Sequence, residues 1–181
     1  RPLGNPAKYI NDLLRHFSKC KDELITSEQY LEYAENLAHE NVGAENVDEK
    51  SRLTELARAY YAYNQIVLQS GALDFGDLIF YTVKLLRERP LVLAKVLKRY
   101  KYVLVDEFQD VNWAQYELVR LLSQSSEIKD RQLTVVGDDD QSIYAFRVAS
   151  VSNILRFKDD FPSAKNVVLN ENYRSEQEIL D

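Results

Sequence analysis

Three carboxylates, Asp106, Glu107 and Asp110, closely follow a short apolar run from Tyr102 to Val105. Carboxylates at the end of a buried strand cost free energy unless a cation or hydrogen-bond donors meet them there. The first carboxylate of such a pair suits Mg²⁺, because this small hard ion prefers oxygen ligands. The second is then free to orient and deprotonate a water molecule. We therefore interpret Asp106 as a metal ligand and Glu107 as a general base in nucleotide hydrolysis.

Polar residues also follow two later apolar runs. Residues 133–136, LTVV, lead into an acidic stretch that ends at Gln141, and residues 166–169, NVVL, lead into a stretch that ends at Arg174. Each run is continuous rather than alternating and is bounded by polar turns, which predicts short strands buried on both faces. The carboxyl ends of parallel strands meet at one rim, where ligands collect. We therefore predict that three strand ends converge on one site containing acids, an amide and an arginine.

Helices are predicted between these strands, over Trp113–Ser123 after an Asn112 cap and over about Val151–Asp159. Alternation of strand and helix predicts a parallel sheet, so the fold class is expected to be α/β. The chain before Gly71 carries only helix signals, including a capping box at Thr26 and Gln29 and a C-terminal cap at Gly71 itself. The helices predicted ahead of the first strand are 28–38, 48–70, 75–89 and 91–99.

Composition narrows the possible functions. The 181 residues are 45% hydrophobic and 29% charged, which is ordinary for a globular protein, and the formal net charge of −6 argues against a simple basic DNA-binding module. The single cysteine, Cys20, excludes an internal disulfide, and His16 and His39 offer no ligand cluster, so we expect no structural metal.

No apolar run is long enough to cross a membrane, and a cytoplasmic setting is expected. Because the chain starts at Arg1 and contains no methionine, we expect it to be part of a larger protein.

Three motifs carry a family resemblance. The segments VDEFQD, VVGDDDQSIYAFR and LNENYRS, in this order and spacing, resemble motifs II, III and IV of the superfamily 1A DNA helicases of the UvrD/Rep/PcrA type. The segment ALDFGDLI at 72–79 resembles a further family segment, LDFDDLL. The resemblance implies a partial RecA-like parallel sheet of the P-loop NTPase type. It assigns residues 73–181 to the later part of motor domain 1A and residues 1–72 to an all-helical 1B-like subdomain.

The resemblance implies ATP and Mg²⁺ as cofactors and gives roles to the strand-end residues. Asp106 would bind Mg²⁺ and Glu107 would act as the base. Gln141 would sense the γ-phosphate or the attacking water, since an amide both donates and accepts hydrogen bonds. Arg174 would reach the γ-phosphate with its planar guanidinium, and Tyr173 would stack on the adenine.

DNA contact is implied for the aromatic residues of the QSIYAFR segment. Tyr144 and Phe146 would stack on bases of single-stranded DNA, a mode that needs no overall positive charge. Arg147 would support the loop or meet a phosphate. Phe75 would add another stacking surface, although an aromatic residue at a helix start can equally pack into a core.

The chain departs from the family pattern in three places. Val148 and Gly76 replace a glycine and an acid that are common in the family, which predicts a stiffer DNA loop and a weaker helix start. None of the five glycines begins a G-x-x-x-x-G-K-[S/T] phosphate loop. We therefore expect an internal segment, inactive alone, of an ATP-dependent 3′-to-5′ helicase that acts on single-stranded or partially duplex DNA. The rest of the helicase chain, with the Walker A half and domain 2A, would complete it.

Two alternatives remain open from the sequence. The chain could be a non-catalytic module, derived from a helicase, that binds DNA or a protein through its helical region. It could instead be a metal-dependent nuclease that uses Asp106, Glu107, Asp110 and residues 138–140 as ligands. Divalent-metal-dependent cleavage of DNA without ATP would separate the nuclease from the helicase.

Overall fold

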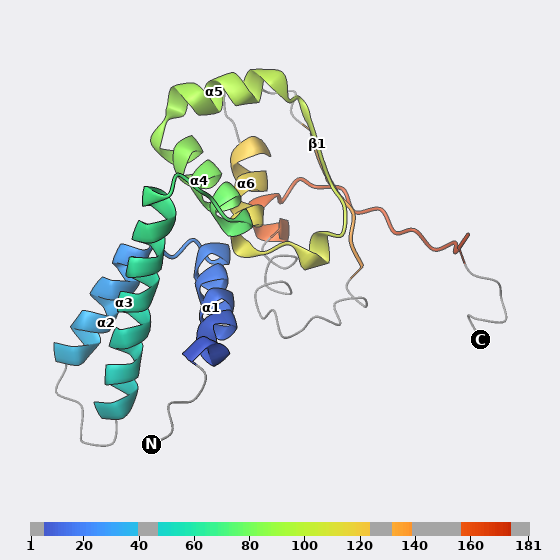
Figure 1. Cartoon of the computed structure of the whole chain (residues 1–181). Helices are drawn as coiled ribbons and strands as arrows, with labels where there is room; N and C mark the ends of the chain where they lie inside the picture. The colour runs from blue at the N-terminus through green and yellow to red at the C-terminus, as the bar shows by residue number, and fades with distance from the viewer. Residues whose placement is uncertain (1–5, 40–46, 124–131, 139–156, 175–181) are drawn as a thin grey trace.

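The computed structural model describes residues 6–39, 47–123, 132–138 and 157–174. In Figure 1, α1, α2 and α3 stand together on one side, and α4, α5 and α6 lie beside the sheet on the other. No helix within the described ranges has the length and apolar character needed to cross a bilayer. The elements are α1 (Ile10–Asp22), α2 (Ser27–His39), α3 (Val47–Gln69), α4 (Phe75–Glu88), α5 (Pro90–Arg99), β1 (Tyr102–Val105), α6 (Trp113–Ser123) and β2 (Gln132–Val135), with short 3-10 helices η1 (Pro6–Tyr9) and η3 (Phe108–Asp110).

Reciprocal side-chain caps begin three of the helices. In each cap, a side-chain oxygen accepts the backbone N–H three residues later, and the later side chain accepts the N–H of the cap residue. These bonds satisfy amides that have no partner within the helix. The capping pairs are Thr26 with Gln29 before α2 (2.9 and 3.1 Å), Asp74 with Asp77 before α4 (2.7 and 3.0 Å) and Asn112 with Gln115 before α6 (both 2.9 Å). The predicted caps at Thr26 and Asn112 are confirmed, as is the C-terminal cap at Gly71, which has a φ of 67° where α3 ends.

Helices α1, α2 and α3 share an aromatic core. The rings of Phe17 and Tyr60 stack at a centroid distance of 5.1 Å, and Tyr30 lies 6.3 Å from Tyr60. Cys20 is buried in the same core, and this burial raises the pKa of its thiol to about 11, so the thiol stays protonated near neutral pH. The core therefore explains the one cysteine as a small packing residue.

Strands β1 and β2 form a parallel pair, which confirms the predicted α/β class. Val105 is in register with Val135, and the ladder continues where the Val136 N–H donates to the Val105 carbonyl at 2.8 Å. The sheet packs on a second core made by Phe108, Val111 and Tyr116, with Phe157 against it. The second strand lies one residue earlier than predicted, at 132–135 instead of 133–136. The prediction that the strands are buried on both faces is wrong among the described residues, because exposed and half-buried residues alternate along both strands and Leu104 is 77% exposed.

The prediction of a third strand at 166–169 is wrong. This segment has no strand structure, and Val167, Val168 and Leu169 are all at least 73% exposed. A strand needs a neighbouring strand for its backbone hydrogen bonds, and the described part of the chain provides none for this segment. Figure 1 shows it leaving the sheet toward the C-terminus. Of the helix predicted over 151–159, only residues from 157 onward are described, and 157–160 are helical.

Helix α1 connects the helical region to the sheet region. Its last residue, Asp22, accepts a hydrogen bond at 2.7 Å from the side-chain amide of Asn112, which caps α6.

A second link joins α4 to α6, where the buried carboxylate of Glu117 pairs with Arg87 at 2.8 Å and with Arg120 at 2.6 Å. Burial opposes the charged form of Glu117, but the hydrogen bonds from the two arginines outweigh it and lower the pKa of Glu117. The predicted domain boundary at 72/73 stays a prediction.

Candidate functional site

The carboxylates of Asp106 and Glu107 lie at the carboxyl end of β1 and are exposed. Oδ1 of Asp106 accepts the backbone N–H of Glu107 at 2.9 Å, which orients this carboxylate at the strand end. The oxygens of an exposed, oriented carboxylate are suitable ligands for Mg²⁺, because this ion binds proteins through one or two carboxylates and keeps several waters. The carboxylate of Asp106 therefore suits a magnesium ion.

Glu107 has an unusual backbone conformation. Its φ of 49° and ψ of 44° lie in the left-handed region, where few residues other than glycine are found and where strained residues often mark functional sites. This conformation turns the chain sharply from β1 into η3. The turn is held by the N–H of Phe108, which donates to the Val136 carbonyl at 2.9 Å, and by the N–H of Asp110, which donates to the Glu107 carbonyl at 2.9 Å. The loop thus places Glu107 beside the end of β2.

Gln109 joins the ends of the two strands. Its side chain is 2% exposed, and its Nε2 donates to Oε2 of Glu107 at 2.6 Å. Its Oε1 accepts the backbone N–H of Asp138 at 3.2 Å. Gln109 was not among the site residues predicted from the sequence. The one signal in the sequence that could have identified Gln109 was its position inside VDEFQD. A glutamine carries no charge, so no charge pattern distinguishes a buried glutamine from one on the surface.

Several predicted site residues lie outside the described part of the chain. These are Gln141, Tyr144, Phe146 and Arg147, and their roles stay predictions. The acids Asp139 and Asp140 of the nuclease alternative also lie there. Within the described ranges, no three His, Cys, Asp or Glu side chains come together as a metal-binding group. Asp106, Glu107, Asp110 and Asp138 therefore do not assemble the multi-carboxylate centre of that alternative.

Tyr173 and Arg174 lie in a bend at the end of the segment that leaves the sheet. The hydroxyl of Tyr173 donates to the carboxylate of Glu171, and this hydrogen bond raises the pKa of Tyr173. The backbone N–H of Arg174 donates to Oδ1 of Asn172 at 2.8 Å. The predicted convergence of three strand ends is therefore wrong for the third, because the segment before Asn170 forms no strand that would bring it to the rim. The roles of Tyr173 and Arg174 with ATP stay predictions.

A buried charge cluster lies beside Phe75 at the start of α4. Lys21 of α1 is 2% exposed, and its Nζ lies 2.6 Å from Oδ2 of Asp74 and 2.8 Å from Oδ1 of Asp77. The contact with Asp77 is an ion pair without a well-directed hydrogen bond. Tyr63 of α3 adds a hydrogen bond, donating its hydroxyl to Oδ2 of Asp74 at 2.8 Å. The cluster thus ties three helices together at one point.

The cluster changes the ionisation of its members. Burial opposes the charged form of Asp74, but hydrogen bonds from Lys21, from the Asp77 N–H and from Tyr63 outweigh it and lower the pKa of Asp74. Burial, with the hydrogen bond to Asp74, raises the pKa of Tyr63 to about 12. Gly76 gives Lys21 room, because a Cβ at this position would lie 3.2 Å from Cδ of Lys21. Any side chain at position 76, including the acid that is common in the family, would crowd the buried side chain of Lys21.

Phe75 does not pack into a core of the described residues. Its side chain is 91% exposed at the first position of α4. Because the backbone of this position is capped by Asp74 and Asp77 and held by Lys21, the aromatic ring projects from a rigid helix start. Packing of Phe75 into a core of the described residues is therefore excluded, and its role as a stacking surface stays a prediction.

Comparison with known proteins decides the family. A family model described as the UvrD/REP helicase N-terminal domain matches residues 5–162. The chain belongs to the UvrD/Rep helicase family. Similar proteins include the ATP-dependent DNA helicase PcrA of Leuconostoc citreum, which is 40% identical over 93% of this chain and 20% of that protein. PcrA of Staphylococcus epidermidis strain ATCC 35984 is 44% identical over 70% of this chain and 17% of that protein.

The UvrD/Rep chain thus spans about a fifth of the length of the curated relatives it matches. The match includes the helices ahead of the sheet as well as the β1 and β2 strand ends. The predicted family resemblance is therefore confirmed, and it extends further toward the N-terminus than the motifs themselves.

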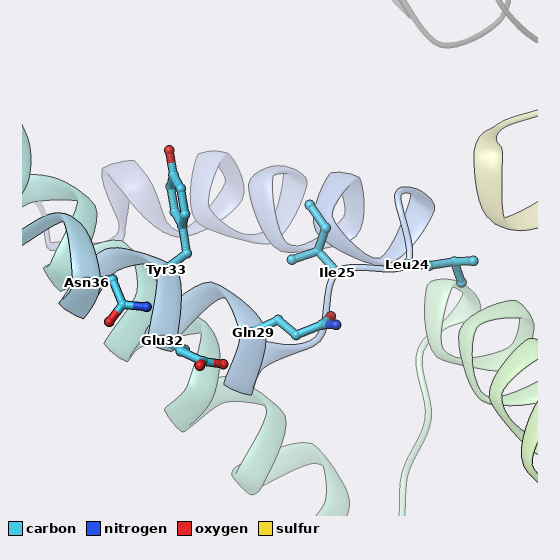
Figure 2. Close-up of a pocket in the computed structure, with 6 residues that line it drawn as sticks. All are labelled: Leu24, Ile25, Gln29, Glu32, Tyr33 and Asn36. Carbon is cyan, nitrogen blue, oxygen red and sulfur yellow. The ribbon is translucent and has the colours of Figure 1, made fainter.

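A shallow hollow of this UvrD/Rep chain lies away from the strand ends. Figure 2 shows it between the turn after α1 and the exposed face of α2. None of the residues predicted to bind ATP or DNA lines it, so we assign it no role in nucleotide hydrolysis. The lining residues are Leu24, Ile25, Gln29, Glu32, Tyr33 and Asn36.

Proposed function

We propose that this chain is a segment of an ATP-dependent 3′-to-5′ DNA helicase or translocase that moves along single-stranded DNA. The observation that carries the proposal is the placement of Asp106 and Glu107 at the carboxyl end of a parallel strand, beside the end of β2. Ligands collect at such strand ends in parallel α/β sheets. The similarity to proteins named ATP-dependent DNA helicase PcrA supports the same conclusion. The cytoplasmic setting stays a prediction.

In this proposal, the residues of the β1 end divide the hydrolysis between them. Asp106 holds Mg²⁺, which neutralises charge on the phosphates when it is bound. Glu107 accepts the proton of the attacking water. Gln141 senses the γ-phosphate, Arg174 stabilises the charge that develops on it, and Tyr173 stacks on the adenine.

Strand binding rests on aromatic side chains in the proposal. Tyr144 and Phe146 stack on bases, and Arg147 supports their loop or meets a phosphate. Phe75 provides a further stacking surface, which its exposure at a rigid helix start supports. Stacking of this kind tolerates any base sequence and is compatible with a chain of net charge −6.

Replacing Phe75 with alanine tests the stacking role. In the full-length protein, we expect the affinity for oligo-dT to fall about 5- to 100-fold, because stacking on an aromatic side chain is worth about 1–3 kcal/mol per base. Packing among the described residues should be unaffected, since the ring is 91% exposed there. The measurement is fluorescence anisotropy of a labelled oligonucleotide. Leu91→Ala, which removes an 88% exposed apolar side chain from α5, is the matched control. Equal affinities of the two variants would contradict the role of Phe75.

ATP hydrolysis with and without single-stranded DNA tests the overall function. We expect the full-length protein to hydrolyse ATP and to be stimulated by DNA. The segment alone should be inactive, because it carries no G-x-x-x-x-G-K-[S/T] loop to hold the β- and γ-phosphates. Hydrolysis by the segment alone would show that the phosphate-loop argument is wrong. A full-length protein that binds DNA but never hydrolyses ATP would favour the binding-module alternative.

A further inference from the structure

We infer that Gln109 is a positioning residue that fixes the carboxylate of Glu107 against the end of β2. This inference rests on the proposed function, in which Glu107 is the general base. Gln109 touches neither the metal ligand Asp106 nor the predicted nucleotide-binding residues through any hydrogen bond of the described structure. Its effect on hydrolysis would therefore pass through Glu107.

The two partners of Gln109 determine how its amide is oriented. A carboxylate oxygen only accepts hydrogen bonds, so Glu107 must face the NH₂ group. A backbone N–H only donates, so Asp138 must face the carbonyl oxygen. The observed contacts of 2.6 and 3.2 Å satisfy both requirements at once. The glutamine amide carries one donor group and one acceptor group, and its side chain is long enough to reach Glu107 with the first and Asp138 with the second.

Burial makes the arrangement rigid. Gln109 is 2% exposed and lies next to Phe108, which is buried in the core under the sheet. A buried amide that lost either partner would leave a polar group unsatisfied, which is costly. The bond to Glu107 is also charge-assisted, and such bonds are shorter and stronger than bonds between neutral groups. The carboxylate of Glu107 is exposed, so this bond is what restrains its side chain.

Gly137 permits this contact from the β2 side. A Cβ at position 137 would lie 2.9 Å from Oε1 of Gln109 and 3.4 Å from both the Gln109 nitrogen and Cβ of Phe108. The clash is with Oε1 of the Gln109 side chain alone, because the two contacts at 3.4 Å are ordinary van der Waals distances. A side chain at position 137 would therefore push the Gln109 amide away from its observed position, and glycine leaves room for it. The same contact means that displacement of the β2 end would displace the carboxylate of Glu107.

Substitution of Gln109 in the full-length protein tests the inference. Gln109→Glu keeps an acceptor for the Asp138 N–H but places a second carboxylate against Glu107. Gly137→Ala keeps both Gln109 and Glu107 but crowds the amide. Both variants should lower kcat for DNA-stimulated ATP hydrolysis about tenfold or more, because general-base catalysis depends on hydrogen-bonding geometry. KM for ATP and the affinity for a non-hydrolysable ATP analogue should change less than about threefold. The reason is that neither variant changes the interactions that bind ATP equally in the ground state and in the transition state.

Two further measurements separate positioning from a general loss of structure. Gln115→Glu, which changes charge by the same amount at a capping position of α6 that glutamate also suits, should leave kcat unchanged. Adding Gln109→Glu to a Glu107→Ala protein should lower the residual rate no further, since residues that act as a unit are not additive. A purely structural role would lower the residual rate and analogue binding together.

The outcomes distinguish this inference from the proposed function. If Glu107→Ala removes hydrolysis and both Gln109→Glu and Gly137→Ala lower kcat selectively, the inference is supported. If Glu107→Ala removes hydrolysis but both other variants keep the wild-type kcat, or lose analogue binding in parallel with kcat, Gln109 is not a positioning residue and the proposed function stands. If Glu107→Ala retains hydrolysis, both the proposed function and the inference are wrong.

Discussion

Replacing Glu107 with glutamine in the full-length protein is expected to lower the rate of DNA-stimulated ATP hydrolysis about 10²- to 10⁴-fold, the usual contribution of a general base. Glutamine is nearly isosteric with glutamate, so the left-handed backbone at this position and the contact with Gln109 are changed little in shape. The amide cannot accept the proton of the attacking water. The measurement is steady-state phosphate release at saturating ATP and single-stranded DNA.

Binding measurements show whether the loss is chemical. The affinities of the Glu107→Gln protein for oligo-dT and for a non-hydrolysable ATP analogue should stay within about threefold of wild type, since the change affects the transition state alone. Glu88→Gln, the same substitution at the exposed end of α4, is the matched control and should retain full activity. A Glu107→Gln protein with undiminished hydrolysis would remove Glu107 from the mechanism.

The second large effect is expected from Lys21→Met, through stability. Removing this lysine leaves the carboxylate of Asp77, which is 1% exposed, without its cation. Breaking a buried ion pair in this way costs about 3–5 kcal/mol. Peptides from α1 and from the start of α4 should therefore exchange their amide hydrogens about 10²-fold faster or more. Hydrogen exchange of the full-length protein, followed by mass spectrometry, measures this locally.

A second variant identifies the unpaired charge as the cause. Adding Asp77→Asn to Lys21→Met removes the uncompensated charge and keeps an oxygen to accept the N–H of Asp74, so part of the protection should return. Lys19→Met, on the exposed face of the same helix, should leave exchange unchanged. If Lys21→Met behaves like Lys19→Met, the cluster does not hold α1 to α4. Because the cluster lies next to Phe75, Lys21→Met should also weaken binding of oligo-dT.

Local features were predicted well from the sequence. The caps at Thr26 and Asn112 are confirmed because each depends on two side chains three residues apart, whose contact follows from the helix turn itself. The strand before Asp106 is confirmed as well, and there a neighbour is present, because β2 pairs with it in a parallel ladder. The family followed from three motifs read in order, and the family match over residues 5–162 covers the first two of them.

The third strand shows where prediction from local pattern fails. NVVL has the composition of a buried strand, yet it is extended and exposed. A strand is completed by hydrogen bonds to a neighbour, and an apolar run carries no information about whether that neighbour is present. Arg174 and Tyr173 are consequently not placed at the rim, although their residue types suit nucleotide binding.

From the sequence alone followed the starts of α2, α4 and α6, the approximate positions of the first two strands, the acidic pair after β1 and the family, whereas α1 (Ile10–Asp22) was not predicted. Tertiary structure alone decided that Lys21 is buried against Asp74, 53 residues later, and that Gln109 reaches the N–H of Asp138, 29 residues later. The physical reason is the range of the interactions. Caps and turns are made by side chains a few residues apart, whereas these buried polar contacts exist because packing brings distant segments together and excludes the water that would otherwise satisfy them.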